Sequence, residues 1–202
     1  MFSHNTNYVS NTFKHNGAGV AVMFSKNINM YKNTFVENKG SASYGLLLKE
    51  IKDGEISNNN FLKNTIGIYA EGTNNMKIKN NDFEFNGWAI KMVSSCYDNE
   101  ITLNNFKLNS FGFTTNSNRF NSKIFKNYWS DYSGYDLNKD GIGDVAHKPM
   151  SLFSYLVQKS PESILLLRSL FMNVMDLLEK ITPTATPAFL SDDQPLMREI
   201  KR

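Results

Sequence analysis

The stretch ISNNNFLKNTIGI, residues Ile56–Ile68, decides the fold because its pattern returns along most of the chain. Asn59 stands two positions before Phe61, and Asn64 stands three positions after it. An isoleucine lies five positions before the aromatic, and a glycine followed by another isoleucine closes the stretch. The short apolar pairs alternate with polar residues, which is typical of strands separated by turns.

The aromatic position of this stretch recurs at spacings of 22, 26, 22, 23 and 23 residues. Its members are Phe13, Phe35, Phe61, Phe83, Phe106 and Trp129. Each of the first five is followed three residues later by an asparagine: Asn16, Asn38, Asn64, Asn86 and Asn109. No segment of this region holds a helical period. The repeat therefore predicts an all-β fold, a right-handed parallel β-helix with one coil of about 22–23 residues per repeat.

Stacked coils give the repeated residues a structural role. Equivalent positions in neighbouring coils lie about 4.8 Å apart, so the asparagines are expected to form amide ladders and the aromatics to stack in the interior. Met30 and Met92 align with apolar positions of other repeats, which predicts that they belong to the core. The spacing of 26 indicates an extra loop of about four residues around Lys39 to Tyr44.

The composition changes abruptly after the repeats. Of 27 asparagines, 25 lie at or before Asn127, whereas all five prolines lie between Pro149 and Pro195. We therefore expect β-helix repeats over 1–130, an Asp- and Gly-rich junction loop over 131–150 and a helical C-terminal tail over 151–202. The first residues carry no secretory signal and begin inside a coil, so we expect N-terminal coils to be missing.

Charge and cysteine content exclude few classes of protein. The formal net charge is +3, with 22 Lys and Arg against 19 Asp and Glu. No segment concentrates one sign of charge as a nucleic-acid surface would, and no stretch has the length of a membrane span. Cys96 is the single cysteine, so the chain has no internal disulfide.

The junction contains YDLNKDGIGD, residues Tyr135–Asp144, which resembles a calcium loop. The twelfth position of an EF-hand loop starting at Asp136 is His147 and not a glutamate, and Pro149 follows, so a complete EF-hand is not expected. We predict a half-loop that binds one structural calcium ion. The alternative is a plain Asp-Gly turn. The predicted ligands are Asp136, Asn138, Asp140, Ile142 and Asp144.

Carboxylates near a lysine raise a rival hypothesis, a carbohydrate-active solenoid such as a polyuronate lyase or epimerase. The local grouping consists of Asp82, Glu84, Asp98 and Glu100 with Lys91. Catalysis requires that these groups meet in one groove. The simpler interpretation is a solvated surface of the coils.

Methionine, histidine and cysteine are potential ligands for a soft metal such as copper. His4, His15 and His147 have no partner at ligand spacing, so binding of a metal by them is not favoured. Cys96, four residues after Met92, is the remaining candidate.

The tail contains an amphipathic segment. SPES, residues 160–163, combines a capping serine with a proline at the first helical position, which predicts a helix over about 161–181. Apolar residues follow at spacings of three and four. This seam either caps the open end of the solenoid or docks on a partner or a membrane surface. Its members are Ile164, Leu167, Phe171, Val174, Leu178 and Ile181.

The region after the repeats resembles the C-terminal signature of the NosD family. The resemblance rests on NYWSDYSGYDLNKDGIGDVAHKP (Asn127–Pro149), SLFSYLV (Ser151–Val157) and DQPLM (Asp193–Met197). It implies a periplasmic β-helix protein of denitrification that helps to mature the copper site of nitrous oxide reductase. Its implied partners are the membrane subunit of an ABC transporter and other maturation factors.

The resemblance implies an accessory protein and not an enzyme, and it implies copper without assigning copper ligands to this sequence. Family members are about twice this length and carry an export signal. We therefore expect a C-terminal portion of such a protein, and the alternative of an inactive truncated fragment stays open.

Overall fold

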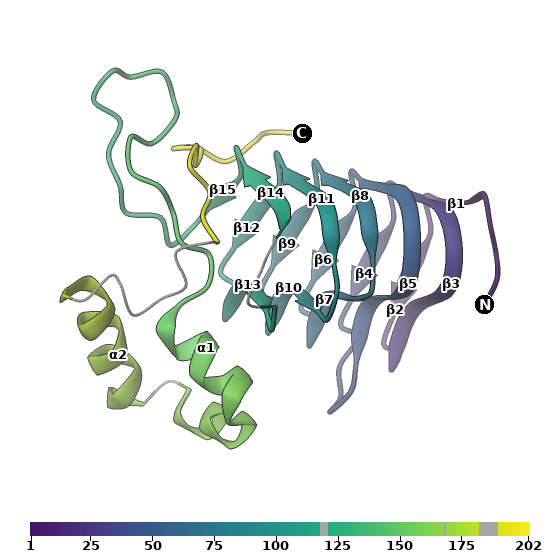
Figure 1. The fold of residues 1–202 in the computed structure, drawn as a ribbon, viewed down its shortest axis with the longest axis horizontal. Coiled ribbons are helices and arrows are strands. Elements are labelled where there is room, and N and C mark those ends of the chain that lie inside the picture. The colour runs from purple at the N-terminus through teal and green to yellow at the C-terminus, as the bar shows by residue number, and fades with distance from the viewer. Residues whose placement is uncertain (118–120, 168, 182–189) are drawn as a thin grey trace.

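The computed structural model describes residues 1–117, 121–167, 169–181 and 190–202. Its main part is a parallel β-solenoid of about five turns, which confirms the predicted parallel β-helix and its helical tail. Figure 1 shows the coils stacked along the long axis of the molecule, with the N-terminus at one end and the helices beside the other.

The described strands form two parallel sheets. The first has nine strands: β1 (Thr6–Val9), β3 (Ala18–Tyr31), β5 (Tyr44–Ser57), β7 (Ile66–Glu71), β8 (Asn74–Lys79), β10 (Trp88–Val93), β11 (Tyr97–Thr102), β13 (Phe111–Thr115) and β14 (Asn121–Phe125). The second has six: β2 (Thr12–Lys14), β4 (Thr34–Val36), β6 (Asn60–Leu62), β9 (Asp82–Glu84), β12 (Asn105–Lys107) and β15 (Tyr128–Trp129).

The first sheet folds over two sides of the solenoid. β5 is 14 residues long, and it pairs with β7 through Tyr44–Lys49 and with β8 through Lys52–Ser57. In later coils the part of the chain that corresponds to β5 forms two separate strands, such as β7 and β8. The second sheet forms the third side of the solenoid. Each coil therefore presents its outward side chains on three different sides.

Two ladders of asparagines connect the coils, as predicted. In the first ladder, the backbone N–H and the side-chain Nδ2 of each asparagine donate to the Oδ1 of the next one toward the C-terminus. From Asn59 to Asn81 these distances are 2.9 and 3.0 Å. The first ladder consists of Asn11, Asn33, Asn59, Asn81, Asn104 and Asn127. The second consists of Asn16, Asn38, Asn64, Asn86 and Asn109.

The repeated aromatics form a continuous stack in the core. Ring centroids of successive members lie 5.1, 4.7, 4.8, 5.0 and 4.0 Å apart from Phe13 to Trp129. Met30 and Met92 are fully buried, which confirms their predicted place in the core. The fold thus satisfies its interior amides with one another and fills the remaining space with aromatic and aliphatic side chains.

The extra loop lies where the spacing of 26 predicts it. Tyr44 pairs with Ile66 across neighbouring coils. Tyr44 follows Asn38 by six positions, whereas Ile66 follows Asn64 by two, so the additional residues lie before β5. They lengthen one coil without changing the register of its strands.

The prediction of one continuous helix over 161–181 is wrong. The tail forms α1 (Leu152–Lys159), the 3₁₀ helix η1 (Pro161–Leu166) and α2 (Leu170–Ile181). Ser169 separates the last two, because its Oγ donates to the Leu166 carbonyl at 2.6 Å and accepts from the Phe171 N–H at 3.2 Å. A serine that caps the backbone in this way begins a new helix and ends the old one.

Candidate docking site and closure of the solenoid

The C-terminal segment 190–202 returns to the solenoid and lies between its last coil and the junction loop. Leu196 forms bridges with Tyr128 of the last coil and with Ile142 of the junction loop. Asp192 forms a further bridge with His147. The segment therefore joins the coils, the junction loop and the C-terminus into one packed end.

Asp192 terminates the first asparagine ladder. Its carboxylate is fully buried and accepts from the Asn127 N–H at 3.0 Å and from Asn127 Nδ2 at 3.1 Å. It also accepts from Trp129 Nε1 at 3.0 Å and from the Lys126 N–H at 3.1 Å. A carboxylate is a strong acceptor, so it can satisfy these four donors of the last coil at once.

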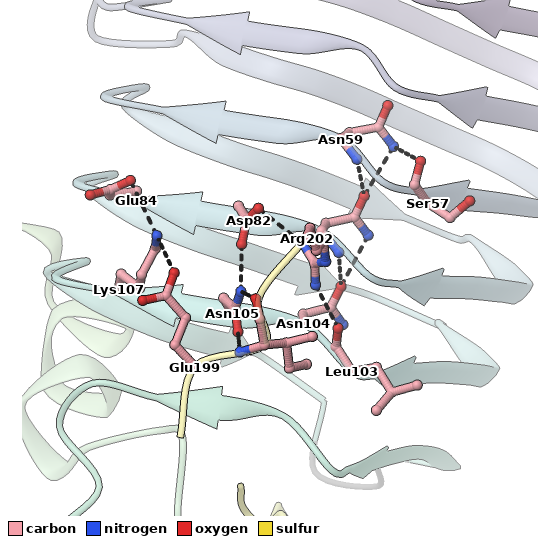
Figure 2. Close-up of polar contacts among 12 residues, drawn as sticks. Ser57, Asn59, Asp82, Glu84, Leu103, Asn104, Asn105, Lys107, Glu199 and Arg202 are labelled. Atoms are coloured by element: carbon pink, nitrogen blue, oxygen red, sulfur yellow. Dashed lines mark hydrogen bonds and ion pairs between the residues drawn. The ribbon is translucent and has the colours of Figure 1, made fainter. Parts of the chain in front are cut away.

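The end of the chain then crosses the second sheet, as Figure 2 shows. The Asn105 carboxamide forms two hydrogen bonds of 3.0 Å with the backbone of Ile200, one as donor and one as acceptor. Arg202 forms an ion pair of 3.0 Å with Asp82 and donates to the Leu103 carbonyl at 2.8 Å. Side chains of the coils thus hold an extended segment that lies almost one hundred residues further along the chain.

Lys107 connects this segment to the solenoid electrostatically. Its Nζ lies 2.8 Å from the carboxylate of Glu199 and 3.5 Å from that of Glu84 (Figure 2). Burial lowers the pKa of Lys107, but the hydrogen bond to Glu199 and the charge of Glu84 outweigh burial and raise the pKa above its ordinary value. Lys107 therefore remains charged and pairs with both acids.

The candidate catalytic groups do not meet in one groove. Asp82 and Glu84 lie on β9 in the second sheet, and Asp98 lies on β11 in the first sheet. Lys91 lies on β10, where its ammonium contacts the Trp88 ring at 5.4 Å. Burial lowers the pKa of Lys91. The arrangement gives no shared acid and base pair for a lyase or an epimerase.

The junction loop is organised by its own carboxylates. Asp136 accepts from the Gly141 N–H at 2.9 Å, and Asp140 accepts from the Ile142 N–H at 2.8 Å. Asp144 accepts from the Leu137 N–H at 2.7 Å, and Asn138 accepts from the Asp140 N–H at 3.1 Å. These contacts order the loop, but Asp136, Asp140 and Asp144 do not come together as a group that could hold a metal ion, and calcium binding stays a prediction.

His147 lies over the end of the aromatic stack. Its ring centroid is 4.9 Å from that of Trp129, and its side chain is 11% exposed. Burial lowers the pKa of His147, although the charges of Asp131 and Asp192 oppose this shift. Its Nε2 lies 3.8 Å from Asp131, which is too far for a hydrogen bond.

The described residues contain no group of three or more His, Cys, Asp or Glu side chains that could hold a metal ion. His4 and His15 lie in the first coils, and His147 lies at the opposite end. Cys96 is buried, its Sγ accepts from the Thr73 N–H at 3.4 Å, and burial raises its pKa. The three histidines and Cys96 of the described chain therefore do not form a shared set of copper ligands.

The predicted apolar seam of the tail divides into two parts. Ile164 and Leu167 pack with Met172 and Met175 of α2 against the cluster of Phe111, Phe153 and Val157. The side chain of Ile181 lies outside the described residues. The remaining apolar side chains of α2, which we call the α2 patch, are exposed by 37% to 82%: Leu170, Phe171, Val174, Leu177 and Leu178.

Helix α1 caps the edge strand β13 of the first sheet, and the methionines of α2 pack on the same apolar cluster. Phe153 of α1 stacks on Phe111 of β13 at 6.1 Å, and Ser154 and Val157 are buried. Helix α2 packs on α1 with its methionines and with Phe171, whose ring meets that of Phe153 edge-on at 6.3 Å, and the other members of the α2 patch are more exposed than Phe171. Capping and an accessible apolar surface are thus present together. No helix of the described chain is long and apolar enough to cross a membrane.

Sequence reasoning missed the role of Asp192. The residue lies within the tail, and the sequence holds no local signal that links it to Asn127, 65 positions earlier. It also missed Tyr132, which stands 23 positions after Asn109 where the second ladder requires another asparagine. That interruption was visible in the spacing of the repeats.

The fold and its closure define a class of protein: a parallel β-solenoid sealed by its own C-terminal segment, with an exposed apolar helix beside the sealed end. The family model of the periplasmic copper-binding protein NosD matches residues 1–134. The chain belongs to the NosD family.

Curated relatives support this assignment. A probable ABC transporter binding protein NosD from Stutzerimonas stutzeri is 29% identical over 144 residues, which are 71% of this chain and 28% of the relative. A protein of the same description from Pseudomonas aeruginosa (strain PAO1) is 30% identical over 125 residues, which are 60% of this chain and 29% of the relative. The matches span less than a third of the length of these relatives. Their names describe binding proteins and not enzymes.

Proposed function

We propose that the chain acts as a periplasmic accessory protein that docks on the membrane subunit of an ABC transporter during maturation of the copper site of nitrous oxide reductase. The NosD family and the transporter-binding names of its relatives support this role. The structural observation that carries the docking proposal is the α2 patch.

An exposed row of large apolar side chains on one helix costs solubility unless a partner covers it. The α2 patch has the spacing of an amphipathic helix that enters an apolar groove, with Leu170, Val174 and Leu177 as its most exposed members. The solenoid supplies a rigid support, because ladders and stacks connect every coil. In this proposal the junction loop, with calcium bound, fixes the helices relative to that support.

Capture of the transporter's membrane subunit in detergent tests the docking role. Replacement of Leu170, Val174 and Leu177 by glutamate should lower capture by about tenfold or more, because buried charges without partners cost several kcal/mol at an interface. These side chains are exposed in the free protein, so the variant should keep the melting temperature and circular dichroism of the wild type.

Leu137→Glu provides the matched control, since Leu137 is 77% exposed and lies in the junction loop, away from α2. It should capture the subunit as the wild type does. Full capture by the triple α2 variant would contradict the docking role. Binding to protein-free lipid vesicles that the triple variant loses would assign the patch to the membrane surface instead.

A further inference from the structure

A pocket of about 250 Å³ lies at the C-terminal end of the solenoid, where the second asparagine ladder stops. One part of its wall comes from the last two coils and the other from the chain that leaves the junction loop. Its polar members are Asn109, Ser110, Ser130, Asp131, Lys148, Ser151 and Ser154, and its apolar members include Phe106, Phe111 and Trp129.

The ladder leaves one donor unsatisfied in this pocket. Asn109 Oδ1 accepts from the N–H and the Nδ2 of Asn86 at 2.9 and 3.0 Å. By the same geometry, the N–H of Asn109 points toward the next coil. Tyr132 stands at the next ladder position in sequence, but its N–H donates to the Trp129 carbonyl at 3.1 Å and its hydroxyl donates to the Val145 carbonyl at 2.6 Å, so the chain turns away from the ladder there. Within the described ranges, the Asn109 N–H has no acceptor.

The first ladder shows which chemistry satisfies such an end. There the N–H of Asn127 meets the carboxylate of Asp192 at 3.0 Å, and the same carboxylate accepts from Trp129 Nε1. The second ladder ends at Asn109 and the first at Asn127, one coil later. Each end presents a backbone N–H as its donor. One end is filled by a carboxylate from the chain, and the other opens into a pocket.

We propose that this pocket binds the carboxylate of a small organic acid, with the Asn109 N–H as its principal donor. Ser130 Oγ accepts from the Leu108 N–H at 2.9 Å, so its hydroxyl proton is available to the same carboxylate. Lys148 places a positive charge in the wall. Asp131 opposes binding, but its side chain is 78% exposed and water screens its charge. Aromatic side chains contact the body of the acid. The site does not depend on the docking role of α2.

Nuclear magnetic resonance of the full chain tests the site directly. Titration with acetate, and then with succinate, should move the amide proton of Asn109 downfield along a saturable curve. Acetamide has nearly the same shape without the charge and should produce no comparable shift, and sodium chloride controls for ionic strength. An Asn109 amide that stays in place, or that responds equally to acetamide, would overturn the proposal.

Two variants sharpen this experiment. Lys148→Gln should weaken acetate binding about threefold to fivefold, the range of a partly exposed ion pair. Lys123→Gln changes a lysine on β14 outside the pocket and should leave the affinity unchanged.

The carboxylate could come from a small organic acid or from an acidic side chain of a protein partner. Titration with an acidic hexapeptide distinguishes these two sources. A shift of the Asn109 amide by acetate and succinate supports a small-molecule site. A shift by the peptide alone would overturn it in favour of an acidic side chain from a protein partner.

Discussion

Asp192 follows Asn127 in space as the next ladder member, although 65 residues separate them in sequence. The Asn127 N–H and Nδ2 donate to one carboxylate oxygen of Asp192 at 3.0 and 3.1 Å, as every earlier asparagine donates to the next amide oxygen. The backbone N–H of each ladder asparagine points toward the C-terminal end, whereas Nδ2 donates both to the next ladder member and back to a carbonyl of the preceding coil. A parallel solenoid therefore needs an acceptor at this end, and a carboxylate supplies it without adding a donor.

Asp192→Ala should lower the free energy of unfolding by about 3–5 kcal/mol, because it leaves the buried Asn127 N–H and Trp129 Nε1 and the part-buried Lys126 N–H without an acceptor. Asp192→Asn should cost less, since its Oδ1 can still accept from Asn127. Urea denaturation measures both. Asp193→Ala is the control: Asp193 is exposed, and its change should stay within about 0.5 kcal/mol. Equal stability of the Asp192→Ala and Asp193→Ala proteins would contradict the closing role.

Phe83 and Phe85 are the same residue type two positions apart, but only Phe83 is buried, so a comparison of the two measures the effect of burial. Phe83 is fully buried between Phe61 and Phe106 at 4.8 and 5.0 Å, whereas Phe85 is 47% exposed. Phe83→Ala should cost about 3–5 kcal/mol through the cavity that it leaves in the stack. Phe85→Ala should cost less than about 1 kcal/mol. A Phe83→Ala protein with the denaturation midpoint of the Phe85→Ala protein would show that the stack does not carry the core.

His147 makes stability dependent on pH. Its pKa in the folded protein lies below the ordinary value of 6.5, because burial disfavours the imidazolium more than Asp131 and Asp192 favour it. Below pH 6.5 the unfolded chain binds a proton that the folded protein rejects, so the free energy of unfolding should fall as the pH drops from 7.5 to 5.5. His147→Gln should flatten this part of the profile, which urea denaturation at several pH values would record.

Calcium should stabilise the protein through the junction loop. At a concentration about 100 times its dissociation constant, one calcium ion adds about 2.7 kcal/mol and should raise the melting temperature by several degrees over that in a chelator. The double change Asp136→Asn and Asp140→Asn should remove this rise. Asp98→Asn on β11 should retain it. Identical melting curves of the wild type in calcium and in chelator would establish the loop as a plain turn.

The repeats made the coils predictable from sequence. Each coil carries the same asparagine and aromatic at the same register, so a local pattern fixes a long-range neighbour one period away. Even the added loop before Tyr44 appears as a change in that period. The core positions of Met30 and Met92 follow from the same alignment.

The closed end could not be predicted in the same way. The contact of Asp192 with Asn127 depends on the path of the intervening chain, which no periodicity encodes. The amphipathic spacing from Ile164 onward predicts a single helix, but the Ser169 hydroxyl competes for the backbone and divides it. Lys91 and Asp98 are close in sequence, and this closeness wrongly suggested that they share one groove. A turn between β10 and β11 places them on different sides of a coil.

The return of the chain to Asn105 through Ile200 sets an order of folding during synthesis. Each coil can pair with its predecessor as soon as it emerges, because its partners lie about 22 residues behind it. The last coil must wait for Asp192, which lies 65 residues beyond Asn127. Contacts between such distant residues form slowly, so the final coils pass through a stage with an open edge that can pair with other chains. Loss of even the last few residues would therefore act first on yield and aggregation.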